Sequence, residues 1–496
     1  MNLTEELLRE LDNSSLAVDE RAALRARAAA GLIDKGRYGE ARSALGEFWR
    51  GAGVRPEVEG LGTRATAEVL LQAGALSGLL GKVKGTQDAA KDLLGESAAL
   101  FEKLGDPHGV ASARSEIALC YWREGAYSEA RVMLEQVAAG VTDDASLKAK
   151  LVIRFAVVEG AAGRYSDALR LLTDYAPLFD EGVSHATRGS FHNELALVLR
   201  RLGAAERRPD YIDRAIIEYT AAAYHAEQAQ HASYLARIEN NIAFLHYKLG
   251  RYGDAHAHLE RARGIFARLG DAGSLAQVDE TRARVLVAEQ RYREAERTLA
   301  TVVGTFEQRD ESALLADALT VQGVVWARLW EYQRSIEALR RAAVLAESAG
   351  ALMSAGRALV TLIEEHGGTW RLTTDELYEA YLRADRLLSD TQEAEDIARL
   401  RACAGVVINR LTNAQFGEKD FTLPGAVHEF EARLIERALA ESGGSLVAAS
   451  RRLGLTHQTL GSILNTRHKQ LAGKRKPPQK RLRSIIKKRK KIGRPH

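Results

Sequence analysis

One spacing of residues recurs along most of the chain and limits what it can fold into. A small residue is followed nine positions later by a tyrosine, and three positions after that by a second small residue. Small residues let two antiparallel helices touch, and the tyrosine is placed to begin the second helix and wedge between the pair. The spacing therefore predicts a series of helical hairpins. Its six copies are Ala29/Tyr38/Ala41, Ala118/Tyr127/Ala130, Ala156/Tyr165/Ala168, Ala243/Tyr252/Ala255, Ala283/Tyr292/Ala295 and Gly323/Tyr332/Ser335, and a seventh copy with a longer turn contains Ala196, Tyr211 and Ala215.

Repetition at a fixed period is typical of a solenoid, in which each helical pair packs on the next. The pattern resembles the tetratricopeptide repeat, although its tyrosines recur at about 40 residues instead of the usual 34. That resemblance implies an all-α, tetratricopeptide-like solenoid of helical hairpins with a concave groove. With divergent copies around Gly85 to Asp106 and Ala351 to Asp390, we expect eight or nine helical pairs between residues 18 and 390.

Polar residues just before the small positions are candidates for the inner surface of the groove. Asn193 and Asn240 stand in equivalent places, three residues before the small residue of their repeats, with Asn241 and Arg237 nearby. Side-chain amides can hold the backbone of a bound peptide by paired hydrogen bonds, and similarly placed Asn residues do so in other tetratricopeptide proteins. The alternative is that these amides only bond neighbouring turns of their own array.

The composition excludes several classes of protein. Only eight prolines occur in 496 residues, which favours helices. Two cysteines, Cys120 and Cys403, cannot form a disulfide framework or a thiolate metal site. No apolar stretch reaches the length of a membrane span, and the N-terminus lacks the regions of a signal peptide. We therefore expect a cytoplasmic protein with no membrane contact.

No pattern supports catalysis. A Gly-rich phosphate loop is missing from the sequence, and no Ser/His/Asp or Cys/His arrangement has a supporting context. His256 and His258 are two residues apart on a predicted helix and so point away from each other. His366 stands beside Glu364 and Glu365 but lacks further ligands. We predict no enzymatic activity, no cofactor and no metal site.

A different pattern follows near the C-terminus, from Gly443 to Leu464. Ser445 is placed to cap a short helix, and Gly454 to end it in a left-handed conformation. Thr456 then caps a second helix, which carries Leu460 and Leu464 on its buried side. Two short helices joined by a tight turn predict a helix-turn-helix.

Together with the upstream residues Glu429 to Leu439, this segment resembles the Fis-type DNA-binding domain that ends many bacterial regulators. The motif residues are Ala448, Ala449, Leu453, Gly454, Leu455, Thr459 and Leu460. The resemblance implies a dimer on double-stranded DNA, with the helix opened by Thr456 in the major groove, and a bacterial, nucleoid-associated protein. Two residues depart from the family: Ser445 replaces the usual Asn, and no Arg or Lys occurs between Thr456 and Thr466.

The candidate DNA contacts lie in and around the second helix. Gln and Asn side chains can read adenine in the major groove, and Arg and Lys meet phosphates. On that helix and its cap the candidates are Thr456, His457, Gln458, Thr459, Ser462 and Asn465. The candidate cations are Arg451, Arg452, Arg467, Lys469, Lys474, Arg475, Lys476 and Arg494.

Charge is divided unevenly between the body of the chain and its end. Residues 467–496 contain 14 Lys or Arg and no acid, which leaves 56 basic and 66 acidic side chains in the rest. A mildly acidic body with a basic tail suits a polyanion. We predict four parts: a repeat solenoid at 18–390, a connecting helix at 391–413, a Fis-type domain at 424–471 and a basic, disordered tail at 472–496.

An apolar stripe precedes the helix-turn-helix. Val427, Phe430, Leu434, Ile435, Ala438 and Leu439 follow helical spacing and predict a homodimer through this region. The sequence thus indicates a transcription regulator whose repeats sense or dock a peptide or protein. The alternative is a non-enzymatic scaffold whose basic C-terminus binds RNA or another acidic partner.

Overall fold

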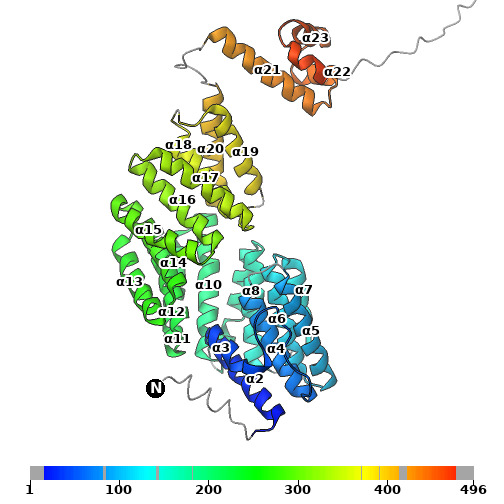
Figure 1. Ribbon diagram of the computed structural model, residues 1–496, viewed down its shortest axis with the longest axis vertical. Helices are drawn as coiled ribbons and strands as arrows, with labels where there is room; N and C mark the ends of the chain where they lie inside the picture. The colour runs from blue at the N-terminus through cyan, green and yellow to red at the C-terminus, as the bar shows by residue number, and fades with distance from the viewer. Residues whose placement is uncertain are drawn as a thin grey trace, which may run out of the picture. The chain divides into compact units, whose positions relative to one another are not determined.

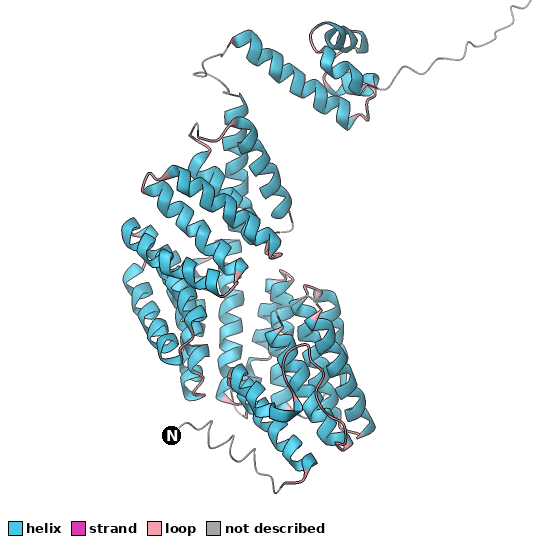
Figure 2. Cartoon of the chain, viewed as in Figure 1, coloured by secondary structure: helices cyan, strands magenta, loops and turns pink. Residues whose placement is uncertain are grey.

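The computed structural model describes residues 16–81, 85–140, 144–180, 182–369, 371–389, 391, 393–412 and 422–475. Within these ranges every regular element is a helix and no strand is present, which confirms the predicted all-α class (Figure 1; Figure 2). The chain divides into two compact units, residues 1–406 and 407–496. Of the described helices, none combines the length and hydropathy that a membrane crossing requires.

The first unit is a series of antiparallel helical pairs, and each helix from α2 to α18 packs on the next one along the chain. Nine pairs lie between Val18 and Leu387 in the described ranges, followed by α20 (Ala394–Thr412). The pairs are α2 (Val18–Asp34) with α3 (Tyr38–Leu45), α4 (Thr63–Leu80) with α5 (Thr86–Lys103), α6 (Pro107–Arg123) with α7 (Tyr127–Gly140), α8 (Ala145–Ala161) with α9 (Tyr165–Asp174), α10 (His185–Glu206) with α11 (Pro209–Gln228), α12 (Ala232–Lys248) with α13 (Tyr252–Leu269), α14 (Ala272–Ala288) with α15 (Tyr292–Gln308), α16 (Ser312–Arg328) with α17 (Tyr332–Ser348), and α18 (Leu352–His366) with α19 (Thr374–Leu387). Short 3-10 helices, η1 (Gly46–Phe48) and η2 (Ala176–Phe179), follow α3 and α9.

The repeated tyrosines mark the start of the second helix in each hairpin. Six helices (α3, α7, α9, α13, α15 and α17) begin at the tyrosine of the repeat, while Tyr211 lies two residues inside α11. The small residues on either side are buried; Ala243 and Ala255, for example, are both 0% exposed. The spacing therefore predicts the hairpins correctly.

The turn before each of these six tyrosines has one conformation. The residue two positions ahead of the tyrosine has a positive φ, as in Gly250 (72°), but in two hairpins this residue is Gln290 (62°) or Trp330 (66°). The next backbone N–H then returns to the first helix; that of Arg251, for example, donates to the carbonyl of His246 at 2.9 Å. This closure satisfies carbonyls at the helix end, so the turn keeps its form without requiring glycine.

The even-numbered helices form the inner layer of the array. From α2 to α18 each contacts the next even-numbered helix, except that α10 and α12 make little direct contact. No comparable contacts join successive odd-numbered helices among the described residues. Helices at a smaller radius lie closer together, so the even-numbered helices line the concave side.

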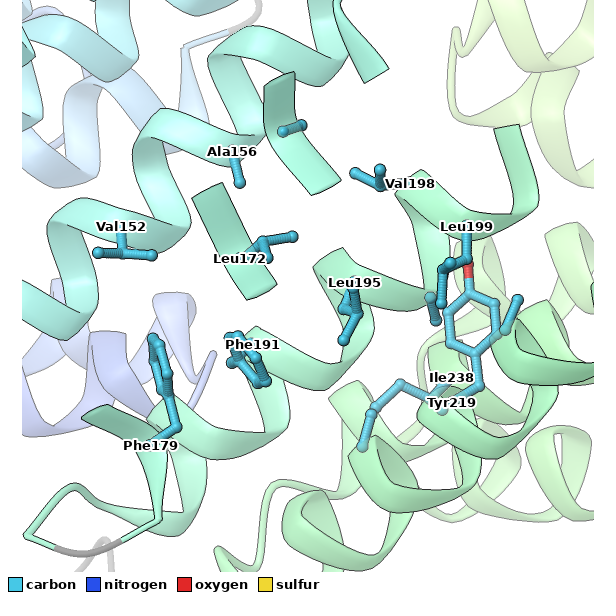
Figure 3. Close-up of a cluster of buried hydrophobic side chains, with 14 of the residues drawn as sticks. Val152, Ala156, Leu172, Phe179, Phe191, Leu195, Val198, Leu199, Tyr219 and Ile238 are labelled. Carbon is cyan, nitrogen blue, oxygen red and sulfur yellow. The ribbon is translucent and has the colours of Figure 1, made fainter. Parts of the chain in front are cut away.

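A cluster of buried side chains joins α8 through α12 (Figure 3). Leu195 and Leu199 of α10 pack in it with Tyr219 of α11 and Ile238 of α12. Tyr219 is 0% exposed and belongs to the same buried cluster as Leu199 of α10 and Ile238 of α12. The buried cluster therefore joins α10 to α12, although these two helices make little direct contact.

In its described residues the second unit contains, after the end of α20, three helices and a short 3-10 helix. They are α21 (Leu423–Glu441), α22 (Leu446–Arg452), α23 (His457–Thr466) and η3 (Lys469–Lys474). Residues 476–496, which include most of the predicted basic tail, lie outside the described residues.

The close helix contact within a hairpin gives a testable stability difference. Replacing Ala255 with Leu inserts methylene groups between α12 and α13 and should lower the free energy of unfolding by about 1–3 kcal/mol. Ala257, two residues along the same helix, is exposed, so Ala257→Leu is the matched control. Urea unfolding followed by circular dichroism measures both variants, and equal stability of the two would contradict close packing at Ala255.

Candidate nucleic-acid interface

The helices of the second unit enclose a small apolar core. Leu439 of α21, Ala449 of α22 and Leu460 and Leu464 of α23 are each at most 1% exposed. The single methyl group of Ala449 lets α22 approach its neighbours closely. Leu471 of η3 is 6% exposed and packs on the same core, so the segment that follows α23 also belongs to the folded unit.

The turns between these helices have the predicted form. The Ser445 hydroxyl accepts a hydrogen bond from the N–H of Ala448 at 3.4 Å and caps α22. Gly454 has a φ of 67° and ends α22 in the left-handed region. The Thr456 hydroxyl accepts from the N–H of Thr459 at 3.1 Å and caps α23. The helix-turn-helix prediction is therefore confirmed.

The outer face of α23 is polar and accessible. His457, Gln458, Ser462 and Asn465 are all exposed, and the last three follow helical spacing along one face. The hydroxyls of Thr456 and Thr459 lie 2.8 Å apart and are engaged in the cap. The structure thus brings the predicted base-reading side chains together on one surface.

Three of the predicted phosphate-binding cations are held by acids of α21. Arg452 pairs with Glu441, Arg467 with Glu431 at 3.1 Å, and Lys474 with Glu436. Exposed ion pairs of this kind contribute little to stability, about 0–1 kcal/mol, so phosphates can compete for these cations.

The other predicted cations differ in their surroundings. Arg451 and Lys469 are exposed, and Arg475 is half-buried. Lys476 and Arg494 lie outside the described residues.

The structure also assembles a cluster that sequence reasoning missed. His428 and Glu431 lie one turn apart on α21, and His468 follows α23. The Nε2 atom of His468 lies 3.0 Å from a Glu431 oxygen, and the ring of His428 stacks on that of His468 with centroids 4.2 Å apart. The hydrogen bond with His468, with the charge of Arg467, holds the pKa of Glu431 below its usual value.

The predicted apolar stripe on α21 divides between two environments. Ile435, Ala438 and Leu439 are 1–5% exposed and belong to the unit's own core. Assigning these three residues to a partner chain was therefore wrong, because their faces are already covered. The exposed large apolar side chains among the described residues of α21 are Leu423, Val427, Phe430 and Leu434, which are 45–66% exposed.

The residues predicted to bind a peptide lie on two helices of the inner layer, α10 and α12, which make little direct contact with each other. Asn193 lies on α10, and Arg237, Asn240 and Asn241 lie on α12. The guanidinium of Arg237 stands 5.4 Å from the centroid of the Tyr234 ring. The buried Oδ1 atom of Asn240 has no hydrogen-bond partner among the described residues. The amide of Asn240 is thus not used by neighbouring turns on its acceptor side.

Other polar groups of α10, α11 and the beginning of α20 are buried or paired. Glu194 is 6% exposed, and burial raises its pKa to about 7. The hydroxyl of Tyr219 is buried and lacks a partner within the described part of the chain. From the beginning of α20, Glu395 pairs with Lys248 of α12 at 2.9 Å, and the preceding Glu393 pairs with Arg201 of α10. Cations of the inner layer are therefore in contact with carboxylates.

The fold and the interface define a helical-repeat protein with a C-terminal helix-turn-helix domain. Residues 426–462 match the sequence family described as bacterial regulatory proteins of the Fis family. The chain therefore carries a Fis-type helix-turn-helix domain, in agreement with the resemblance seen in the sequence. Among curated proteins no relative matches the chain.

The chain is also similar to several solved helical structures. One is a signal-transduction ATPase with numerous domains and a tetratricopeptide repeat sensor, from Pyrococcus horikoshii (13% identity, 75% of this chain and 55% of that one, TM-score 0.47). A second is a Rap protein complexed with competence and sporulation factor (15% identity, 79% and 99%, TM-score 0.46). A third is yeast Tom70 (13% identity, 86% and 88%, TM-score 0.41).

Proposed function

We propose that the protein is a DNA-binding transcription regulator whose repeat array binds a peptide or protein segment. The observation that carries this proposal is the Fis-type domain at residues 426–462, whose helix α23 presents an exposed polar face. The proposal requires no catalytic step. Its setting is the bacterial cytoplasm, at the nucleoid.

In this proposal α23 enters the major groove of duplex DNA. Gln458 and Asn465 carry amides that can bond adenine in a bidentate manner, and His457 lies beside them at the start of the helix. The hydroxyls of Thr456, Thr459 and Ser462 contact the sugar-phosphate backbone or base edges. The cations around the helix neutralise flanking phosphates, and the sequence extends this charge through Lys476 to Arg494.

If α23 reads bases, removing one base-reading side chain should lower the affinity for the preferred site more than the affinity for random DNA. Gln458→Ala should weaken binding to the preferred site by roughly 1–3 kcal/mol and have much less effect on random DNA. The site is first located by genome-wide footprinting in the host, and affinities are then measured by gel shift. Gln470 is exposed and lies outside α23, so Gln470→Ala is the matched control.

Two outcomes would count against this proposal. Equal weakening on all DNA sequences by Gln458→Ala would remove the base-reading role. Equal competition by tRNA for the unmodified protein would instead favour a scaffold whose basic end binds RNA.

We also propose that two chains pair through α21. The exposed residues Leu423, Val427, Phe430 and Leu434 follow one another at intervals of four, three and four, which places them on one face of the helix. A folded unit of this size has little core of its own. Pairing would cover the stripe and place two copies of α23 about one turn of DNA apart.

Dimer formation can be tested with a charge in the stripe. Phe430→Glu should convert the full-length protein from a dimer to a monomer in light scattering, because a carboxylate would be buried without a partner. Val447 on α22 is 50% exposed and lies outside the stripe, so Val447→Glu should leave the dimer intact. A monomeric unmodified protein at tens of micromolar would exclude pairing.

For the repeat array, we propose a ligand segment that is acidic and lies across α10 and α12. The unpaired Oδ1 of Asn240 supports a ligand that donates a backbone N–H there. Arg201 and Lys248 pair with the carboxylates of Glu393 and Glu395, which supports an acidic ligand at these two cations. In this proposal Asn193 of α10 and Arg237 and Asn241 of α12 contact the same segment.

This assignment predicts a loss of partner binding without a loss of DNA binding. A photoreactive residue at position 237 should form a cross-link to a partner in the host, and replacing both Asn193 and Asn240 with Ala should reduce its yield. Gln308→Ala, on the outer helix α15 where the side chain is exposed, is the control. An unchanged cross-link in the double variant would reject the role of the two amides, and the operator gel shift should not respond to them.

A further inference from the structure

Two histidines and a glutamate converge between α21 and the segment after α23. His428 and Glu431 are three residues apart on α21, which places them on one side of the helix. His468, just after the end of α23, is 0% exposed, and its ring stacks on that of His428. One ligand atom from each of the three residues lies within 4.8 Å of the others.

We propose that His428, Glu431 and His468 form a binding site for a divalent transition-metal ion such as Zn²⁺. Two imidazole nitrogens and one carboxylate oxygen are a donor set that zinc accepts, with water as the fourth ligand. Imidazole ligands argue against Mg²⁺ and Ca²⁺, which prefer oxygen donors only.

The present geometry is close to what an ion requires. Two ligands of one tetrahedral zinc ion lie roughly 3.3 Å apart when each bond is about 2.0–2.1 Å. The His468 Nε2 and Glu431 Oε2 atoms are 3.0 Å apart already. Only the third ligand, His428, must still move toward the other two atoms. Its side chain is exposed and can rotate without disturbing the core.

Metal binding would change the partner of Arg467. Its guanidinium lies 3.1 Å and 3.2 Å from the two oxygens of Glu431, and its side chain is 62% exposed. An ion on Glu431 would repel the guanidinium and turn it toward solvent, because like charges at this distance disfavour each other. If the proposed DNA binding holds, the released Arg467 becomes available to a phosphate beside α23.

The site can be tested with metal alone. Full-length protein without an affinity tag should bind one equivalent of Co²⁺ with visible absorption typical of nitrogen and oxygen ligands, and Zn²⁺ should abolish that absorption. Loss of even an outer partner of a ligand costs about 10–100-fold in metal affinity. His428→Ala, which removes an exposed side chain, should therefore weaken Co²⁺ binding at least about tenfold while the circular dichroism stays unchanged.

A neighbouring substitution separates coordination from general charge. Glu429 is exposed on the same helix, and Glu429→Gln should retain the cobalt spectrum, whereas Glu431→Gln should lose it. Absence of a one-equivalent site, or the same affinity in His428→Ala as in the unmodified chain, would overturn the proposal. Gel shifts with and without Zn²⁺ then test the link to Arg467 separately, so a failure of DNA binding leaves the metal result intact.

Discussion

Two antiparallel helices can touch only where the side chain between them is small, and this constraint sets the register of the repeat array. At Gly323 an added Cβ would lie 2.5 Å from Cγ of Leu339, so even alanine would force the Leu339 side chain of α17 to move. The carbonyl of Gly323 also accepts a hydrogen bond from the Ser335 hydroxyl at 2.7 Å. The two small residues of one hairpin thus determine how its two helices align. The tyrosine between them begins the second helix at the position that this alignment requires.

Much of this could be predicted from sequence because the constraint is local. The spacing of Ala243, Tyr252 and Ala255 lies within one hairpin, and the caps at Ser445 and Thr456 act over three residues. The all-α class, the starts of the helices and the turn of the helix-turn-helix follow from such short distances. Propensity alone would not place a left-handed turn at Trp330, where the repeat imposes the conformation on an unfavourable residue.

Sequence reasoning failed where distant segments meet. His428 and His468 are 40 positions apart, and nothing in their neighbouring residues indicates that the two rings stack. A His and a Glu three residues apart on a predicted helix were the only local signal. The stripe on α21 shows the same limit, since helical spacing identifies apolar residues but does not divide those facing the core, such as Ile435, from those left exposed, such as Phe430.

The pairing of cations with acids on α21 bears on how the proposed regulator would distinguish sites. Affinity for DNA in general comes from neutralising phosphates, and it is independent of sequence. Arg452 and Arg467 must leave Glu441 and Glu431 before they can meet phosphates, and α23 itself contributes no Arg or Lys. The described part of the domain therefore gains less electrostatic binding free energy from DNA of any sequence than its number of Arg and Lys residues indicates. In the proposed function, the remaining binding free energy comes from the basic residues 476–496 and from contacts that only the correct bases make, such as those of Gln458 and Asn465.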